Sequence, residues 1–155
     1  MKYFILIFAI LFSACSVKNY EHTKSKLFII KSPLIKFADL GYVRNSSQDI
    51  EIELFMAGKS IKKIEINHLI CVDDGCMTKS GFNEDYLHES YPADILQNIL
   101  LGNPIYDKLN LEKNELGFTQ KIKNKKVYIK YKVDNNQIFF KDIKNRIIFK
   151  IKEIN

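Results

Sequence analysis

The sequence has few of the residues that enzymes use for chemistry. Its 155 residues include three histidines, three cysteines and six glycines. No serine lies in the context of a nucleophile elbow, and no glycine-rich phosphate loop is present. We therefore predict that the protein is not an enzyme and that it has no catalytic residue, no bound metal and no cofactor.

The three histidines do not change this prediction. His22 lies in a polar segment near the N-terminus. His68 falls within a predicted strand on the parity of the apolar side chains, and we interpret it as a satisfied or edge histidine. His88 belongs to the acidic stretch 84–89, which has the groups to hold a metal or to perform acid–base chemistry. We interpret that stretch as a solvated loop.

The sequence also lacks an apolar run long enough to span a bilayer, which takes roughly 20 residues. Its most apolar run, from Tyr3 to Ala14, is shorter and follows the positive charge of Lys2. Apolar runs of about 10–14 residues with such flanks are typical of signal-peptide cores. We predict that residues 1–14 form a signal peptide.

The end of this run, Ser13-Ala14-Cys15, resembles a bacterial lipobox. That resemblance implies cleavage before Cys15, a diacylglycerol on its thiol and acylation of the new N-terminus. Several acyl chains anchor a protein stably without a spanning helix. The alternative is an ordinary secretory signal cleaved after Ala14, with Cys15 incidental.

A lipidated Cys15 places the mature chain outside the cytoplasm, in the cell envelope. Ser16, rather than Asp, resembles the signal for outer-membrane sorting, with the domain in the periplasm. Residues 15–26 are polar and aperiodic after the cysteine, so we predict a flexible tether there. Residues 27–155 are enough for a single domain with its own core, and we expect a monomer.

The remaining cysteines, Cys71 and Cys76, flank a predicted turn at Asp74-Gly75. Two cysteines that face each other across a hairpin in an oxidising compartment are most simply a disulfide. A redox pair, a metal site and a pair of free thiols remain alternatives.

The charge is basic, with 24 Lys and Arg residues against 18 Asp and Glu residues. Such an excess can indicate a nucleic-acid or anionic-lipid partner. No recognition helix, aromatic RNA motif or zinc pattern accompanies it. We interpret the excess as a lysine-faced β surface in water and predict no nucleic-acid partner.

Alternation of apolar and polar residues predicts strands along most of the chain. Residues 49–56 and 127–133 alternate with period two, as half-buried strands do. Short turns join the predicted strands, which favours antiparallel neighbours. We expect a meander of eight to ten strands that curls around its single apolar face.

One helix is predicted, at residues 92–101. Ser90 is a plausible N-cap, Pro92 suits the first turn, and Gly102 with Pro104 ends the helix. The fold class is therefore mainly β (α+β), a curled antiparallel sheet or half-open β-barrel with one lid helix.

This order of elements resembles the LolA/LolB-like fold, and most closely the LolB-like outer-membrane lipoproteins. The segments that carry the resemblance are Leu101-Gly102-Asn103-Pro104 after the predicted helix and the closing hairpin around Asp142–Lys144. Departures from the family are the absence of tryptophan and the presence of Cys71 and Cys76 where the family has a glycine–proline segment. The resemblance implies an apolar cavity that takes acyl chains, lined here by Ile52, Leu54, Ile64, Ile66, Val127, Ile129 and Tyr131.

Two functions follow as expectations. The first is binding or transfer of lipid or lipoprotein acyl chains at the membrane, with lipoproteins or their carrier as partners. The second is a structural or interaction lipoprotein, an adhesin or assembly accessory, whose core is filled and holds no ligand.

Overall fold

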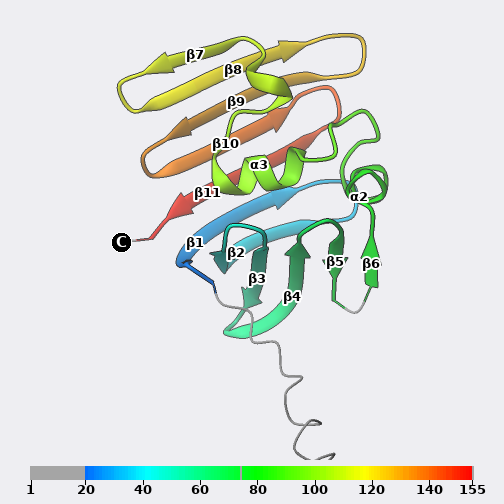
Figure 1. Cartoon of the computed structure of the whole chain (residues 1–155), viewed down its shortest axis with the longest axis vertical. Helices are drawn as coiled ribbons and strands as arrows, with labels where there is room; N and C mark the ends of the chain where they lie inside the picture. The colour runs from blue at the N-terminus through cyan, green and yellow to red at the C-terminus, as the bar shows by residue number, and fades with distance from the viewer. Residues whose placement is uncertain (1–19, 74, 155) are drawn as a thin grey trace, which may run out of the picture.

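The computed structural model describes residues 20–73 and 75–154. They form one 11-stranded antiparallel sheet with two α-helices, so the mainly β prediction is confirmed. The sheet is not closed, because β6 and β7 are its edges (Figure 1). The strands are β1 (His22–Lys31), β2 (Lys36–Asn45), β3 (Ile50–Met56), β4 (Lys59–Ile66), β5 (Ile70–Val72), β6 (Gly75–Met77), β7 (Leu111–Asn114), β8 (Gly117–Lys123), β9 (Tyr128–Asp134), β10 (Gln137–Asp142) and β11 (Ile147–Glu153).

The sheet consists of two meanders that meet at its centre. Strands β1 to β6 run to one edge, strands β7 to β11 return from the other, and β1 pairs with β11. The connection between the two edges contains α2 (Lys79–Tyr86), α3 (Ile95–Leu101) and the 3₁₀ turn η1 (Tyr106–Lys108). We call β1–β6 the N-terminal half and β7–β11 the C-terminal half.

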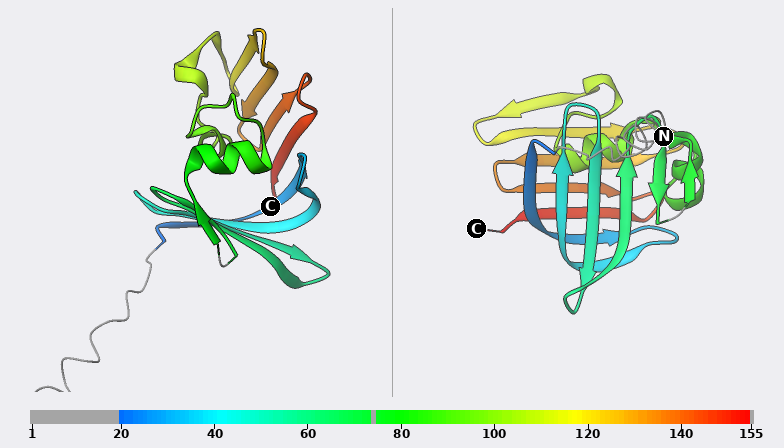
Figure 2. Two further views of the ribbon diagram at one scale, coloured as in Figure 1. Left: turned by 90° about the vertical axis from the view of Figure 1, so that its right-hand side faces the viewer. Right: turned by 60° about the horizontal axis from the view of Figure 1, so that its bottom comes forward.

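The two halves bend toward each other around α3 (Figure 2). We call the face that α3 covers concave and the opposite face convex. The apolar stripe of α3 is buried in the concavity, through Ile95, Leu96, Ile99 and Leu100. A helix of this length is marginal alone, so packing on the sheet stabilises it.

Strand parity follows the predicted alternation. In β11, Ile147, Phe149 and Ile151 are buried while Lys150 and Lys152 are exposed. Gly41 in β2 shows how tightly the concave face is packed, since an added Cβ would lie 2.9 Å from the Phe28 ring.

Two predictions about local structure are wrong. β1 begins at His22, not Leu27, because Glu21 N donates to Asn45 O and β1 pairs with β2 from His22 onward. Residues 22–26 therefore lie in the sheet and not in the tether. The prediction of a single helix is also wrong, because residues 79–86 form α2; the Thr78 side chain caps this helix by accepting from Gly81 N at 3.0 Å.

Helix α3 is shorter than the helix predicted at residues 92–101. α3 begins at Ile95, and its N-cap is Asp94 without a side-chain capping bond. Ser90 instead lies 2.8 Å from His88 through its hydroxyl and the ring Nδ1. The predicted end is confirmed, because Gly102 takes the left-handed conformation with φ of 70°.

Candidate functional site

The seven residues predicted to line a cavity lie together in the hydrophobic core. They come from both halves of the sheet and are only 0–3% exposed. They are Ile52 and Leu54 in β3, Ile64 and Ile66 in β4, Val127 before β9, and Ile129 and Tyr131 in β9. The apolar residues of α3 belong to the same cluster, so these side chains pack against protein atoms.

A depression opens at one end of the concavity, beside the C-terminal end of α3. It has a volume of about 340 Å³, and a smaller one of about 160 Å³ adjoins it through Lys26, Leu101 and Glu153. We call the larger depression the mouth. Its lining combines basic, acidic and apolar side chains: His22, Lys24, Lys26, Val43, Asn45, Leu100, Leu101 and Glu153.

The basic side of the mouth comes from the first residues of β1. Lys24 and Lys26 share the parity of Phe28 and Ile30, so the strand directs them to the concave face. Lys26 is 8% exposed, an unusual position for a lysine. Burial lowers the pKa of Lys26 below its ordinary value, and the nearby Glu153 carboxylate opposes that shift.

Glu153 is the acidic group of the mouth. Its Oε1 lies 2.8 Å from Lys24 Nζ and 3.9 Å from Lys26 Nζ. The hydrogen bond from Lys24 lowers the pKa of Glu153, although burial opposes the shift. Two ammonium groups share one carboxylate, so the mouth keeps a positive charge that can attract an anion.

The apolar side of the mouth is the end of α3. Leu100 is buried, whereas Leu101 is 39% exposed beside the two lysines. The left-handed turn at Gly102 presses this end on the sheet, since an added Cβ would lie 3.2 Å from Val133 Cγ1. The Tyr131 hydroxyl fixes the following segment by donating to Asn103 O at 2.9 Å.

A buried carboxylate, Asp142, binds the segment that precedes α3. Asp142 is fully buried at the end of β10 and accepts a 2.8 Å hydrogen bond from the Tyr91 hydroxyl. Burial and this carboxylate raise the pKa of Tyr91. Asp142 also accepts from the backbone N–H groups of Tyr128, Lys144 and Asn145. These bonds make Asp142 a structural acid that fastens the β10–β11 turn to the segment before α3.

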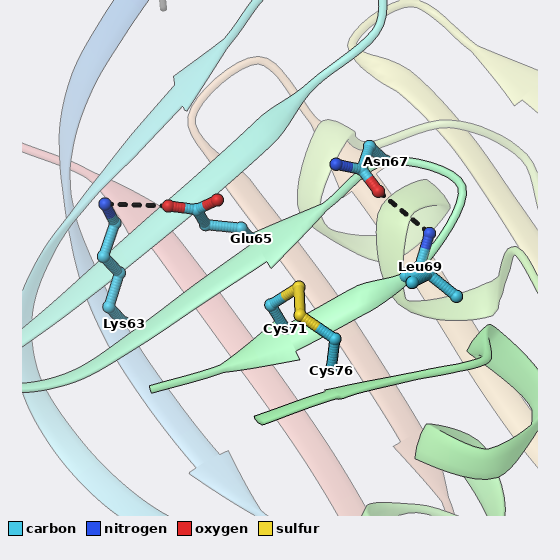
Figure 3. The surroundings of a disulfide bond; sticks show 6 residues. All are labelled: Lys63, Glu65, Asn67, Leu69, Cys71 and Cys76. Carbon is cyan, nitrogen blue, oxygen red and sulfur yellow. Dashed lines mark hydrogen bonds and ion pairs between the residues drawn. A yellow bond between two sulfur atoms is a disulfide. The ribbon is translucent and has the colours of Figure 1, made fainter. Parts of the chain in front are cut away.

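The predicted cysteine pair lies at the edge of the sheet, away from the mouth. Cys71 and Cys76 face each other directly across the β5–β6 hairpin with an S–S distance of 2.04 Å (Figure 3). The neighbouring turn residue Asp73 binds β4, accepting from Lys62 Nζ at 3.0 Å and Lys63 N at 3.2 Å. A disulfide of this kind stabilises an edge that has few neighbours. The predicted turn residue Asp74 lies outside the described residues.

The remaining predicted sites are placed as follows. Cys15 lies outside the described residues. His68 is exposed in the turn between β4 and β5, so its placement within a strand is wrong. In residues 20–73 and 75–154, no group of three His, Cys, Asp or Glu side chains is arranged to hold a metal ion. No helix in this part of the chain has the length and apolarity to cross a bilayer.

Comparison of the chain with protein-family models, curated proteins and solved structures finds no match.

Sequence reasoning missed the mouth, because residues 16–26 were assigned to a tether. A signal was present in Thr23-Lys24-Ser25-Lys26-Leu27-Phe28, where Lys24 and Lys26 continue the parity of Phe28. Lysines on the apolar parity of a strand indicate a place where the apolar face reaches water or meets an anion.

Proposed function

We propose that this chain is a lipid-anchored envelope protein that binds a lipid acyl chain at the mouth of its curved sheet, as LolB-like lipoproteins do. In this proposal Cys15 carries the anchor at the outer membrane, and the domain is a half-open barrel in the periplasm with α3 as its lid. The acyl chain belongs to a lipid or to a lipoprotein delivered by its carrier.

The observation that carries the proposal is a buried cation beside an exposed apolar side chain. Lys26 and Leu101 meet at the mouth, where both line the larger and the smaller depression. A lipid with an anionic headgroup offers both complements, because its charge matches Lys24 and Lys26 and its chain matches Leu101. Each buried methylene contributes about 0.8 kcal/mol.

Binding deeper than the mouth requires movement of α3. The core residues behind Leu101 are packed, and an acyl chain cannot enter without displacing Leu100 or Ile99. The helix has seven residues, and its C-terminal end rests on Gly102 and the Tyr131 hydroxyl. Opening would expose four apolar side chains that α3 buries, so we expect the acyl chain to bind at the mouth and not deeper.

The test is binding of a fluorescent fatty acid to a chain that begins at Ser16, which retains every described residue. We expect saturable binding that Leu101→Ser weakens about tenfold, since it replaces an apolar contact by a hydroxyl. The matched control is Leu109→Ser, because Leu109 is similarly exposed but lines neither depression. Lys26→Gln should weaken the binding of the fatty acid more than it weakens the binding of the uncharged alcohol analogue. No binding, or equal loss in both leucine variants, would overturn the proposal.

The second candidate is a structural or interaction lipoprotein with a filled core. It is favoured by the packing of all seven predicted cavity residues and by apolar groups exposed on the convex face. Leu27, Leu40 and Tyr42 are each more than a third exposed there, and Leu27 pairs directly with Leu40. Under this function the same chain stays empty in the fatty-acid experiment and copurifies with no lipid.

A further inference from the structure

The convex face of the C-terminal half carries a dense array of lysines. β8, β9, β10 and β11 each place alternate residues on this face, and seven of these residues are lysine. We call them the lysine face: Lys121, Lys123, Lys130, Lys132, Lys141, Lys150 and Lys152. Six of the seven are exposed and Lys141 is half-buried.

The strand register places like charges directly opposite one another. Lys121 pairs with Lys130 across β8 and β9, and Lys130 pairs with Lys141 across β9 and β10. Neighbouring strands are about 4.8 Å apart, and like charges opposite each other destabilise a sheet. The repulsion within this row therefore opposes folding.

Few carboxylates neutralise the lysine face. Among the described residues, Lys132 is the one member within 4.0 Å of a carboxylate, at 3.4 Å from Asp134. Glu112 lines a depression of about 370 Å³ with Lys121, Lys130 and Lys132 on the same face. The array keeps a strong positive potential over a broad, regular surface.

An aromatic ring lies among these ammonium groups. The Tyr128 ring has Lys121 and Lys130 at 6.0 Å and Lys123 at 5.3 Å from its centroid. Cation–π attraction at exposed sites holds lysines only weakly, so their ammonium groups stay available to a ligand. A tyrosine with an apolar body and a polar tip suits a membrane interface.

We propose that the lysine face is a docking surface for an anionic phospholipid bilayer. The array is regular and made of lysine alone, which acts as a point charge and tolerates varied headgroup geometry. Single-stranded nucleic acid would require exposed stacking rings, but Tyr128 and Phe139 are half-buried. The lipobox at Cys15 would bring a bilayer within reach. The proposal does not depend on acyl-chain binding at the mouth.

The test is flotation of the unlipidated chain that begins at Ser16 with phospholipid vesicles. We expect binding to mixed phosphatidylcholine–phosphatidylglycerol vesicles and none to pure phosphatidylcholine vesicles. Binding should disappear in about 1 M salt, where the screening length falls to about 3 Å. This chain carries no acyl anchor, so the result is independent of Cys15 modification and of fatty-acid binding at the mouth.

The deciding variant neutralises the central row, as Lys121→Gln, Lys130→Gln and Lys141→Gln together. Each lysine near an anionic surface contributes about fivefold in binding, so the triple variant should lose about a hundredfold. The matched control removes the same charge from exposed lysines elsewhere, as Lys59→Gln, Lys108→Gln and Lys113→Gln together.

Two further measurements make the outcome decisive. The three row lysines changed to Arg should retain vesicle binding, and the Gln variant should unfold at the same or higher urea concentration than the parent chain. Equal loss in the row and control variants would overturn the proposal, because net charge alone would then explain binding. Tighter binding of single-stranded DNA than of anionic vesicles would also overturn it and assign the face to nucleic acid.

Discussion

The two halves of the sheet differ in whether the charges on their convex faces are paired. In the N-terminal half, acids and bases alternate across strands: Arg44 Nη1 lies 2.6 Å from Glu51 and 3.0 Å from Glu53. Lys63 Nζ lies 2.9 Å from Glu51 and 2.8 Å from Glu65 (Figure 3 shows the latter pair). In the C-terminal half the convex face carries seven lysines and few acids, of which Glu112 is one, and the acid Asp142 is inside the core.

The difference suggests that the charges of the N-terminal half stabilise the fold, whereas those of the C-terminal half serve binding. The N-terminal network satisfies its own charges, and the Tyr20 hydroxyl adds a 2.9 Å hydrogen bond to Glu51. The lysine face leaves its charges for an external anion, so stability in that half must come from the core and from Asp142. The following changes test this contrast, beginning with the largest expected effect.

Asp142→Ala should cause the largest loss of stability. It removes the acceptor of the Tyr91 hydroxyl, which then remains buried without this partner, and of several part-buried backbone N–H groups. The free energy of unfolding should fall by on the order of 4 kcal/mol. Urea denaturation followed by circular dichroism measures it, with the exposed Asp85→Ala on α2 as the control. A loss below that of a surface ion pair would contradict the assigned role.

Glu51→Gln should cause a smaller loss of stability than Asp142→Ala, and the size of this loss should depend on pH. Burial alone would raise the pKa of Glu51, but hydrogen bonds from Lys63, Tyr20 and Arg44 outweigh it and hold the pKa below its ordinary value. The carboxylate therefore stabilises the fold above the ordinary Glu pKa, and this contribution is lost as pH falls through the lowered pKa. We expect a loss of about 2 kcal/mol at neutral pH.

The measurement for Glu51 is the urea midpoint of parent and variant from neutral pH to about pH 3. The difference between them should be constant near neutrality and shrink below the ordinary Glu range. Glu112→Gln is the matched control, because it removes an exposed carboxylate from the other half. A difference that grows on acidification would show that the pKa of Glu51 is not lowered in the folded chain.

The sequence predicted most of the sheet because period-two alternation survives wherever one face is buried. It missed α2, since Lys79-Ser80-Gly81 is polar and the helix buries only Phe82 and Asn83. The start of β1 was missed because its first residues are polar on both faces, and only pairing with β2 orders them. The sequence predicted a lysine-faced β surface, and the parity of Lys24 and Lys26 with Phe28 was a signal for the mouth. The extent of both surfaces was not predictable, because it depends on which strands become neighbours, above all on the β1–β11 pairing.

Lys130→Glu should have the smallest effect on stability, and it should be a gain. The change converts the row Lys121–Lys130–Lys141 into alternating charges, the arrangement that the N-terminal half already has. Cross-strand pairs of opposite charge contribute about 0.5 kcal/mol each, and the gain should diminish at high salt.

The control for this gain is Lys63→Glu in the N-terminal half. It places a third acid between Glu51 and Glu65, so it should destabilise the chain by about 2 kcal/mol or more. The same Lys130→Glu chain should bind anionic vesicles less tightly than the Lys130→Gln chain. Because one substitution then raises stability and lowers binding, the lysine at this position is explained by an external anion and not by the fold. If Lys130→Glu instead destabilises the chain as much as Lys63→Glu does, the two convex faces share one role and the contrast between the halves fails.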